Sequence, residues 1–193
     1  MKVIVFGSAG RLGRLLMAGA TSRSHEAAAF AGDPLDRIAV AAAIEGRDAV
    51  LYAVEPAGGR RRDDTASQGA LRVVRAMTQH GVRRLVCLSG SGARPGPDPE
   101  EPWLYRRVIK PVFLGGDSAD LRRVEVTVRQ SGLEWTLVRP ARLVDEPAKH
   151  CWRAGPGYSL PHGTKIARAD VAAFMLDELE VGENVGHAVA VAW

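Results

Sequence analysis

The sequence begins Met1-Lys2-Val3-Ile4-Val5-Phe6-Gly7-Ser8-Ala9-Gly10-Arg11-Leu12-Gly13, an apolar run that leads into three regularly spaced glycines. The apolar run before the first glycine predicts a buried strand, and a helix is expected to start just after the second glycine. Gly7 permits a tight turn off the strand, and Gly10 lets backbone approach a ligand closely. Gly13 removes the side chain where helix meets sheet. The stretch therefore predicts a strand–turn–helix corner.

The start of that helix is a candidate anion site. Its free N–H groups and its positive dipole end favour a pyrophosphate, which indicates a dinucleotide. The glycine spacing is G-x-x-G-x-x-G, not the commoner G-x-G-x-x-G. In the alternative interpretation, the glycines serve packing only. The first interpretation predicts cofactor contacts at these residues: Gly7, Ala9, Gly10, Arg11, Leu12 and Gly13.

Composition is ordinary for a globular protein. The 193 residues fit one domain, residues 1–193, and the net charge of +4 is modest. We expect no nucleic-acid partner, because no basic helix or aromatic platform accompanies this charge. No apolar run is long enough to span a bilayer and no secretory pattern opens the chain, so we expect a cytoplasmic protein without a membrane contact. The two cysteines, Cys87 and Cys151, make no disulfide framework, and Cys87 is expected in the core.

Strand and helix patterns alternate along the whole chain, without a repeat. Strands are expected at 25–30, 48–54, 84–89, 134–138 and 187–191, and helices at 11–20, 35–44, 65–80, 103–114, 118–130 and 170–180. Asp33 is the expected cap of the second helix, and Arg139-Pro140 is expected to stop the fifth strand. The stretch 141–165 is irregular or short-stranded. This alternation predicts an α/β fold with a doubly wound parallel sheet.

Ligands of such sheets bind beyond the carboxyl ends of the strands. Those ends carry residues 7–11, 54–56, 89–92 and 139–142, which we expect to converge on one crevice.

Five segments, in order along nearly the whole chain, resemble a known family. They are Gly7 to Gly13, Gly32 to Asp36, Gly81 to Ser89, Ser131 to Pro140 and Ile166 to Ala172. The chain resembles the atypical short-chain dehydrogenases/reductases of the NmrA-like and flavin reductase/biliverdin-IXβ reductase type. The resemblance implies a Rossmann-like fold, an NAD(P)H site along the first glycine turn, and often reduction of flavins or other conjugated substrates. Further cofactor contacts are expected at Asp33, Val54, Ser89 and Pro140, with the nicotinamide near Pro140.

The chain departs from this family pattern at the adenosine side. Only five residues, 27–31, separate His25-Glu26 from Gly32-Asp33, so one strand of the usual first half is expected to be missing. That segment usually carries the acid for an NAD ribose or the Arg for an NADP 2′-phosphate. Because no acid is present there, we expect NADP rather than NAD. Arg11 and Arg14 are candidate replacements for the Arg, or else solvated helix charges.

The Tyr-x-x-x-Lys pair of typical short-chain dehydrogenases is also absent. Asp117 and Leu121 stand at the corresponding positions, and the five-residue spacing of Tyr105 and Lys110 does not place them on one helical face. The reductases that the chain resembles act without that pair, because the reduced nicotinamide supplies the hydride. The loss argues against alcohol dehydrogenation more than against reduction.

Three residues are candidates for the chemistry. Ser89 ends a strand and is placed to bond a substrate carbonyl or the nicotinamide amide, or else to cap a turn. Tyr105 is a candidate proton donor, or else a packing aromatic. Arg142 is a candidate for binding an anionic substrate, or else it forms a surface ion pair with Asp145 or Glu146. No spacing of metal ligands occurs, and none is expected.

The first hypothesis is an NAD(P)H-dependent reductase of a small conjugated or aromatic substrate, with that small molecule as its partner. The alternatives are a non-redox enzyme, such as an isomerase, cyclase or lyase, on the same scaffold without a working cofactor site, and a non-catalytic dinucleotide sensor. No oligomeric state is predicted from the sequence.

Overall fold

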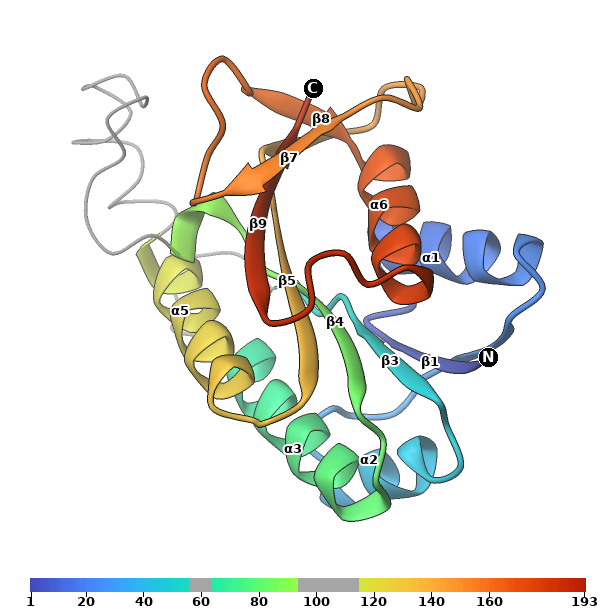
Figure 1. Cartoon of the computed structure of the whole chain (residues 1–193). Helices are drawn as coiled ribbons and strands as arrows, with labels where there is room; N and C mark the ends of the chain where they lie inside the picture. Colours follow the sequence, from blue (N-terminus) through green and yellow to red (C-terminus); the bar gives the residue numbers. More distant parts are fainter. Residues whose placement is uncertain (56–63, 94–114) are drawn as a thin grey trace.

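A seven-stranded sheet forms the centre of the computed structural model, which describes residues 1–55, 64–93 and 115–193 (Figure 1). In sheet order, its strands are β2 (Glu26–Ala29), β1 (Lys2–Phe6), β3 (Ala49–Tyr52), β4 (Arg84–Leu88), β5 (Glu134–Pro140), β9 (His187–Ala192) and β7 (Arg153–Pro156). A second sheet pairs β6 (Arg142–Val144) with β8 (Lys165–Ala167).

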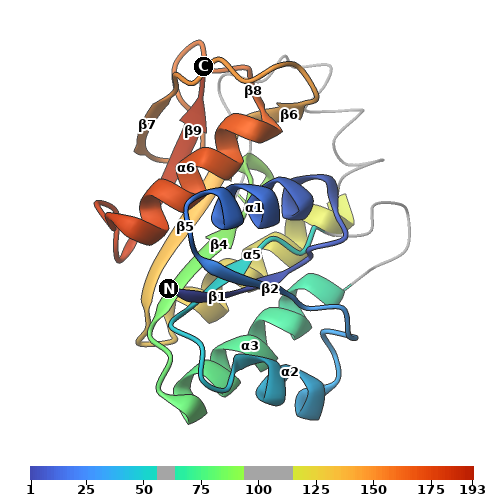
Figure 2. The ribbon, with the colours of Figure 1, turned by 90° about the vertical axis from the view of Figure 1, so that its right-hand side faces the viewer.

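Helices cover both faces of the large sheet, as Figures 1 and 2 show. Helices α1 (Arg11–Ser22) and α6 (Arg168–Glu180) pack side by side on one face, and α2 (Arg37–Ile44), α3 (Thr65–His80) and α5 (Gly115–Arg129) cover the other. A 3₁₀ turn, η1 (Ser91–Ala93), follows β4. Strand β1 serves both cores, because Val3 and Val5 face α1 and α6 whereas Ile4 and Phe6 face α2 and α3. This two-sided burial explains the uninterrupted apolar run of the opening sequence.

The predicted doubly wound α/β fold is confirmed, with one exception in strand direction. All neighbouring strands from β2 to β9 pair in parallel, but β7 is antiparallel to β9. The missing strand is confirmed as well. Relative to the common doubly wound order 3-2-1-4-5-6, the described part of the sheet ends at β2, where a third strand would otherwise lie.

Two predicted boundaries are wrong. Helix α2 starts at Arg37, because the carboxylate of Asp36 caps it by accepting the N–H groups of Ile38 and Ala39. Asp33 instead accepts the N–H of Leu35 in the preceding turn. Strand β5 runs through Pro140, which pairs with Val191 of β9. A proline is tolerated at this position because it ends the strand.

The predicted helix at 103–114 lies outside the described residues. The other expected helices are present with ends shifted by a few residues, and Gly81 stops α3 as expected, at a φ of 71°.

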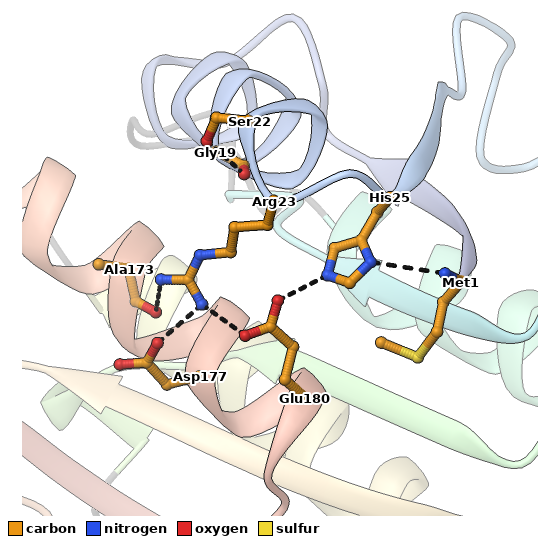
Figure 3. Close-up of polar contacts among 8 residues, drawn as sticks. All are labelled: Met1, Gly19, Ser22, Arg23, His25, Ala173, Asp177 and Glu180. Atoms are coloured by element: carbon orange, nitrogen blue, oxygen red, sulfur yellow. Dashed lines mark hydrogen bonds and ion pairs between the residues drawn. The ribbon is translucent and has the colours of Figure 1, made fainter.

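A charged cluster joins the end of α1 and the start of β2 to α6 (Figure 3). The Arg23 guanidinium lies 2.7 Å from the Asp177 carboxylate and 2.9 Å from that of Glu180. His25 Nε2 lies 2.7 Å from Glu180, and its Nδ1 lies 3.5 Å from the terminal amine of Met1. Burial acts to lower the pKa of Arg23, but the hydrogen bonds and charges of the two acids outweigh it, so the pKa is raised and the guanidinium stays charged. The cluster fixes α1 against α6 at the amino ends of β1 and β2, opposite the glycine corner.

We expect a thiol reagent to modify only Cys151 in the folded protein. Cys87 is fully buried as expected, and burial, aided by the charge of Glu125, raises the pKa of its thiol, whereas Cys151 is exposed. The thiolate is the reactive form, so raising the pH to about 9 leaves Cys87 unreactive. Thiol titration with a chromogenic disulfide checks this. The variant Cys151→Ser should react only after unfolding, and rapid reaction of that folded variant would contradict the assignment.

Candidate functional site

The corner between β1 and α1 requires glycine at two positions for steric reasons. Gly7 has a φ of 80°, and a Cβ there would lie 2.3 Å from the carbonyl oxygen of Ala53, the residue that follows β3. A Cβ on Gly13 would lie 2.1 Å from the Gly7 carbonyl oxygen. Both distances are far below van der Waals contact, so the helix packs on the strand end only because these side chains are absent.

The first turn of α1 presents backbone N–H groups at this corner. Gly10 is the N-cap, with a φ of −67° and no side-chain cap, and its own N–H donates to Gly7 O at 3.0 Å. The N–H groups of the next three residues have no partner within the helix. Ala9 and Gly10 are exposed, whereas the buried Leu12 side chain anchors the helix in the core. An uncapped, exposed helix start of this kind fits a diphosphate.

The predicted strand-end residues lie along one edge of the sheet. Val54 follows β3, Ser89 follows β4 and Pro140 ends β5. These strands lie in the order β1-β3-β4-β5, and each pair of neighbours is parallel. Val54 adjoins the corner directly, because its amide nitrogen lies 2.9 Å from the position of a Gly7 Cβ. These strand ends therefore share one edge of the sheet, and their convergence on one crevice stays a prediction.

A buried ion pair lies directly behind Ser89. The Ser89 hydroxyl donates to Glu125 Oε1 at 2.7 Å, and Arg139 binds the same carboxylate through Nε at 2.7 Å and Nη2 at 2.6 Å. Only 4% of Glu125 and 3% of Arg139 are exposed. Ser89 itself is only 5% exposed, and its hydroxyl proton points to Glu125.

Sequence reasoning missed Glu125 and Tyr158. The Arg139 guanidinium also donates to Gly157 O at 2.7 Å and lies 3.6 Å from the centre of the Tyr158 ring. The loop after β7 is thereby held against the ends of β4 and β5. A glutamate at a buried helix position is a weak signal by itself, and Tyr158 lies in the stretch expected to be irregular.

The adenosine side has no acid at the end of β2. Phe30 follows that strand, and its ring packs on Phe6 with centroids 4.5 Å apart. The nearest acid, Asp33, is exposed, and one of its carboxylate oxygens accepts the N–H of Leu35. No carboxylate therefore stands ready at the strand end for a ribose hydroxyl.

Arginines surround the corner. The Arg11 guanidinium pairs with Asp145, and Arg14 donates to the carbonyl oxygen of Ala9. Arg142, on β6, is exposed and forms no ion pair within residues 1–55, 64–93 and 115–193. The two carboxylates named in the alternative interpretation of Arg142 bind other cations in the structure: Asp145 binds Arg11 and Arg168, and Glu146 binds Lys165.

Tyr105, Lys110 and Pro56 lie outside the described residues. Across the part of the chain that the structure describes, no cluster of His, Cys, Asp or Glu has a metal-binding arrangement.

A doubly wound sheet that opens on an uncapped glycine corner defines the class of Rossmann-type nucleotide-binding folds. Within this class, the sequence pattern of the NAD(P)H-binding family matches residues 22–181. The chain belongs to this family. The match starts after the glycine corner, so the corner's geometry and the family pattern are independent observations.

Solved structures share the fold along the whole chain. A candidate exported protein from Burkholderia pseudomallei is 24% identical, with a TM-score of 0.79 and 100% of both chains covered. A short-chain dehydrogenase/reductase from Veillonella parvula, in complex with NADP, is 15% identical, with a TM-score of 0.78 over 100% of this chain and 94% of that one. A candidate NADH-flavin reductase from Streptococcus pneumoniae is 17% identical, with a TM-score of 0.74 over 100% and 99%. At these identities the likeness concerns the fold. Among the described helices, none is both long and apolar enough to cross a membrane.

Proposed function

We propose that this protein is an NAD(P)H-dependent reductase of a small conjugated or aromatic substrate, such as a flavin or quinone. The observation that carries the proposal is the uncapped first turn of α1, which lies at the same carboxyl edge of the sheet as Val54, Ser89 and Pro140. Membership of the NAD(P)H-binding family supports it, and so does the NADH-flavin reductase name of one structural neighbour.

The cofactor diphosphate would lie on the N–H groups from Gly10 to Leu12, and the nicotinamide near Ser89 and Pro140. The bound nicotinamide supplies the hydride. The protein's contribution would then be orientation: the Ser89 hydroxyl, held by its hydrogen bond to Glu125, would accept a hydrogen bond from the nicotinamide amide. Arg142 is exposed on β6 and has no ion-pair partner among the described residues, so it would attract an anionic group of the substrate.

The residues around the adenosine side favour NADP. A negative side chain at the end of β2 would select NAD, and the described structure has only Ala29 and Phe30 there. Arg14, exposed on the first turn of α1, is the proposed partner of the 2′-phosphate, because its bond to the Ala9 carbonyl is readily exchanged for a phosphate.

Titration with NADPH and NADH, followed by nicotinamide fluorescence, tests the proposal. We expect saturable binding of NADPH, with NADPH oxidation when a flavin or quinone is added. No binding at about millimolar cofactor, far above the Kd of a working site, would overturn the proposal and leave a non-redox enzyme. Tight binding without hydride transfer to any acceptor would identify a dinucleotide sensor instead.

Replacing Arg14 with glutamine tests the cofactor preference. We expect NADPH affinity to fall about tenfold, and NADH affinity to stay within about twofold, because only NADPH carries the 2′-phosphate. Arg72→Gln is a matched control, since Arg72 is also a helical arginine that donates to a nearby backbone carbonyl, that of Gln68. An equal loss for both nucleotides would show that Arg14 does not read the 2′-phosphate.

A further inference from the structure

We propose that Asp145 competes with the cofactor's phosphate for Arg11 and so sets the affinity for the dinucleotide. The inference rests on the cofactor site proposed above and concerns its regulation by the protein's own carboxylate. It assigns a role to Asp145, which follows β6 and is distant in sequence from the glycine corner.

The ion pair joins the corner to the second sheet. Arg11 is the first residue of α1, and its Nη1 lies 2.5 Å from Asp145 Oδ2. Both side chains are open to solvent, with 66% of the Arg11 side chain and 56% of the Asp145 side chain exposed. Asp145 is therefore a negative charge held next to the turn whose N–H groups would receive a diphosphate.

A second arginine neutralises Asp145 from the other side. Arg168 is the first residue of α6, and its Nη1 lies 2.6 Å from Asp145 Oδ1, with only 17% of its side chain exposed. Within the described residues, Arg168 Nε is buried without a hydrogen-bond acceptor. Asp145 thus keeps one charged partner when Arg11 leaves it, and Arg168 has little freedom to follow.

The two arginines differ in what they can do. Arg168 is held in place, while Arg11 has an exposed, flexible side chain attached to the phosphate-facing turn itself. An exposed ion pair is weak in water, whereas a guanidinium binds a phosphate with two parallel, charge-assisted hydrogen bonds. A phosphate arriving at the first turn of α1 would therefore draw Arg11 away from Asp145. The free energy of phosphate binding would then be reduced only by the strength of the Arg11–Asp145 ion pair that is broken.

Measuring NADPH affinity in a double-mutant cycle tests this competition. D145N should bind NADPH about three- to fivefold more tightly, because it frees Arg11 from an exposed pair. R11Q should bind about tenfold more weakly, because it loses a bond to phosphate. In the R11Q background, D145N should change the NADPH affinity less than about twofold, since the Arg11 guanidinium that Asp145 would bind is then absent. E146Q is the matched control: it removes the same charge one residue away, from a carboxylate paired with Lys165, and should leave the affinity unchanged.

The outcomes separate this inference from the proposed reductase. Equal tightening by D145N with and without Arg11, or equal tightening by E146Q, would show a general charge effect and overturn the competition. So would an unchanged affinity in D145N. The predicted pattern without hydride transfer to any acceptor would overturn the reductase and leave the competition standing. Absence of NADPH and NADH binding in every variant would overturn both.

Discussion

Replacing Glu125 with glutamine is expected to lower the free energy of unfolding by about 3–5 kcal/mol. The Glu125 carboxylate takes two hydrogen bonds from Arg139 and one from Ser89, and almost none of the pair's surface reaches water. Glutamine keeps the shape but removes the charge, so the Arg139 guanidinium is left buried without a counter-ion. Denaturant unfolding followed by circular dichroism gives the difference directly.

Glu134→Gln is the matched control for this prediction. Glu134 pairs with Arg83 at 2.9 Å, but both side chains are exposed, so the expected cost is about 0–1 kcal/mol. The double variant Glu125→Leu, Arg139→Met should recover most of the loss, because apolar side chains of similar volume replace a buried ion pair at little cost. A loss below about 1 kcal/mol for Glu125→Gln would mean that the pair is solvated in solution.

Replacing Gly10 with aspartate is expected to weaken NADPH binding about 100-fold or more. An N-cap aspartate accepts the N–H groups of the first turn, which are the groups proposed to hold the diphosphate, and its charge repels a second anion. The fold should tolerate the change, because Gly10 has an ordinary φ of −67° and α1 has no side-chain cap to lose. The added Cβ would lie 3.2 Å from the Gly7 carbonyl oxygen, a contact that a small shift relieves.

Gly10→Asn separates the charge from the shape. Asparagine caps helices as well as aspartate and has the same size, so both variants should unfold within about 0.5 kcal/mol of each other. Their NADPH affinities should differ by about tenfold or more, with the aspartate variant weaker. Equal affinities would show that no anion binds at this turn, while thermal unfolding confirms that both proteins are folded.

Several features of the site can be predicted from the sequence because they depend on neighbours in the chain. The turn at Gly7 and the close packing at Gly13 follow from the absence of a side chain within a strand–turn–helix segment. That the described sheet ends at β2 also follows from the sequence, because too few residues separate β2 from the Gly32-Asp33 pair to form another strand. The cap of α2 was not predicted correctly, because two aspartates stand close together before the helix. Asp36 caps it, and Asp33 accepts a hydrogen bond in the preceding turn.

The opening strand and glycine corner, the alternation of elements and the buried character of Cys87 were thus determined by the sequence alone. Which charged side chains meet depends on the folded arrangement of the helices and strands. Glu125 of α5 binds Ser89, which follows β4, and Asp145 pairs with Arg11, 134 residues away in the sequence. Side-chain pairs of this kind depend on how separate elements pack, and no local pattern of residues records that packing. The corner is a property of consecutive residues, whereas its proposed control by Asp145 arises only when β6 is placed beside α1.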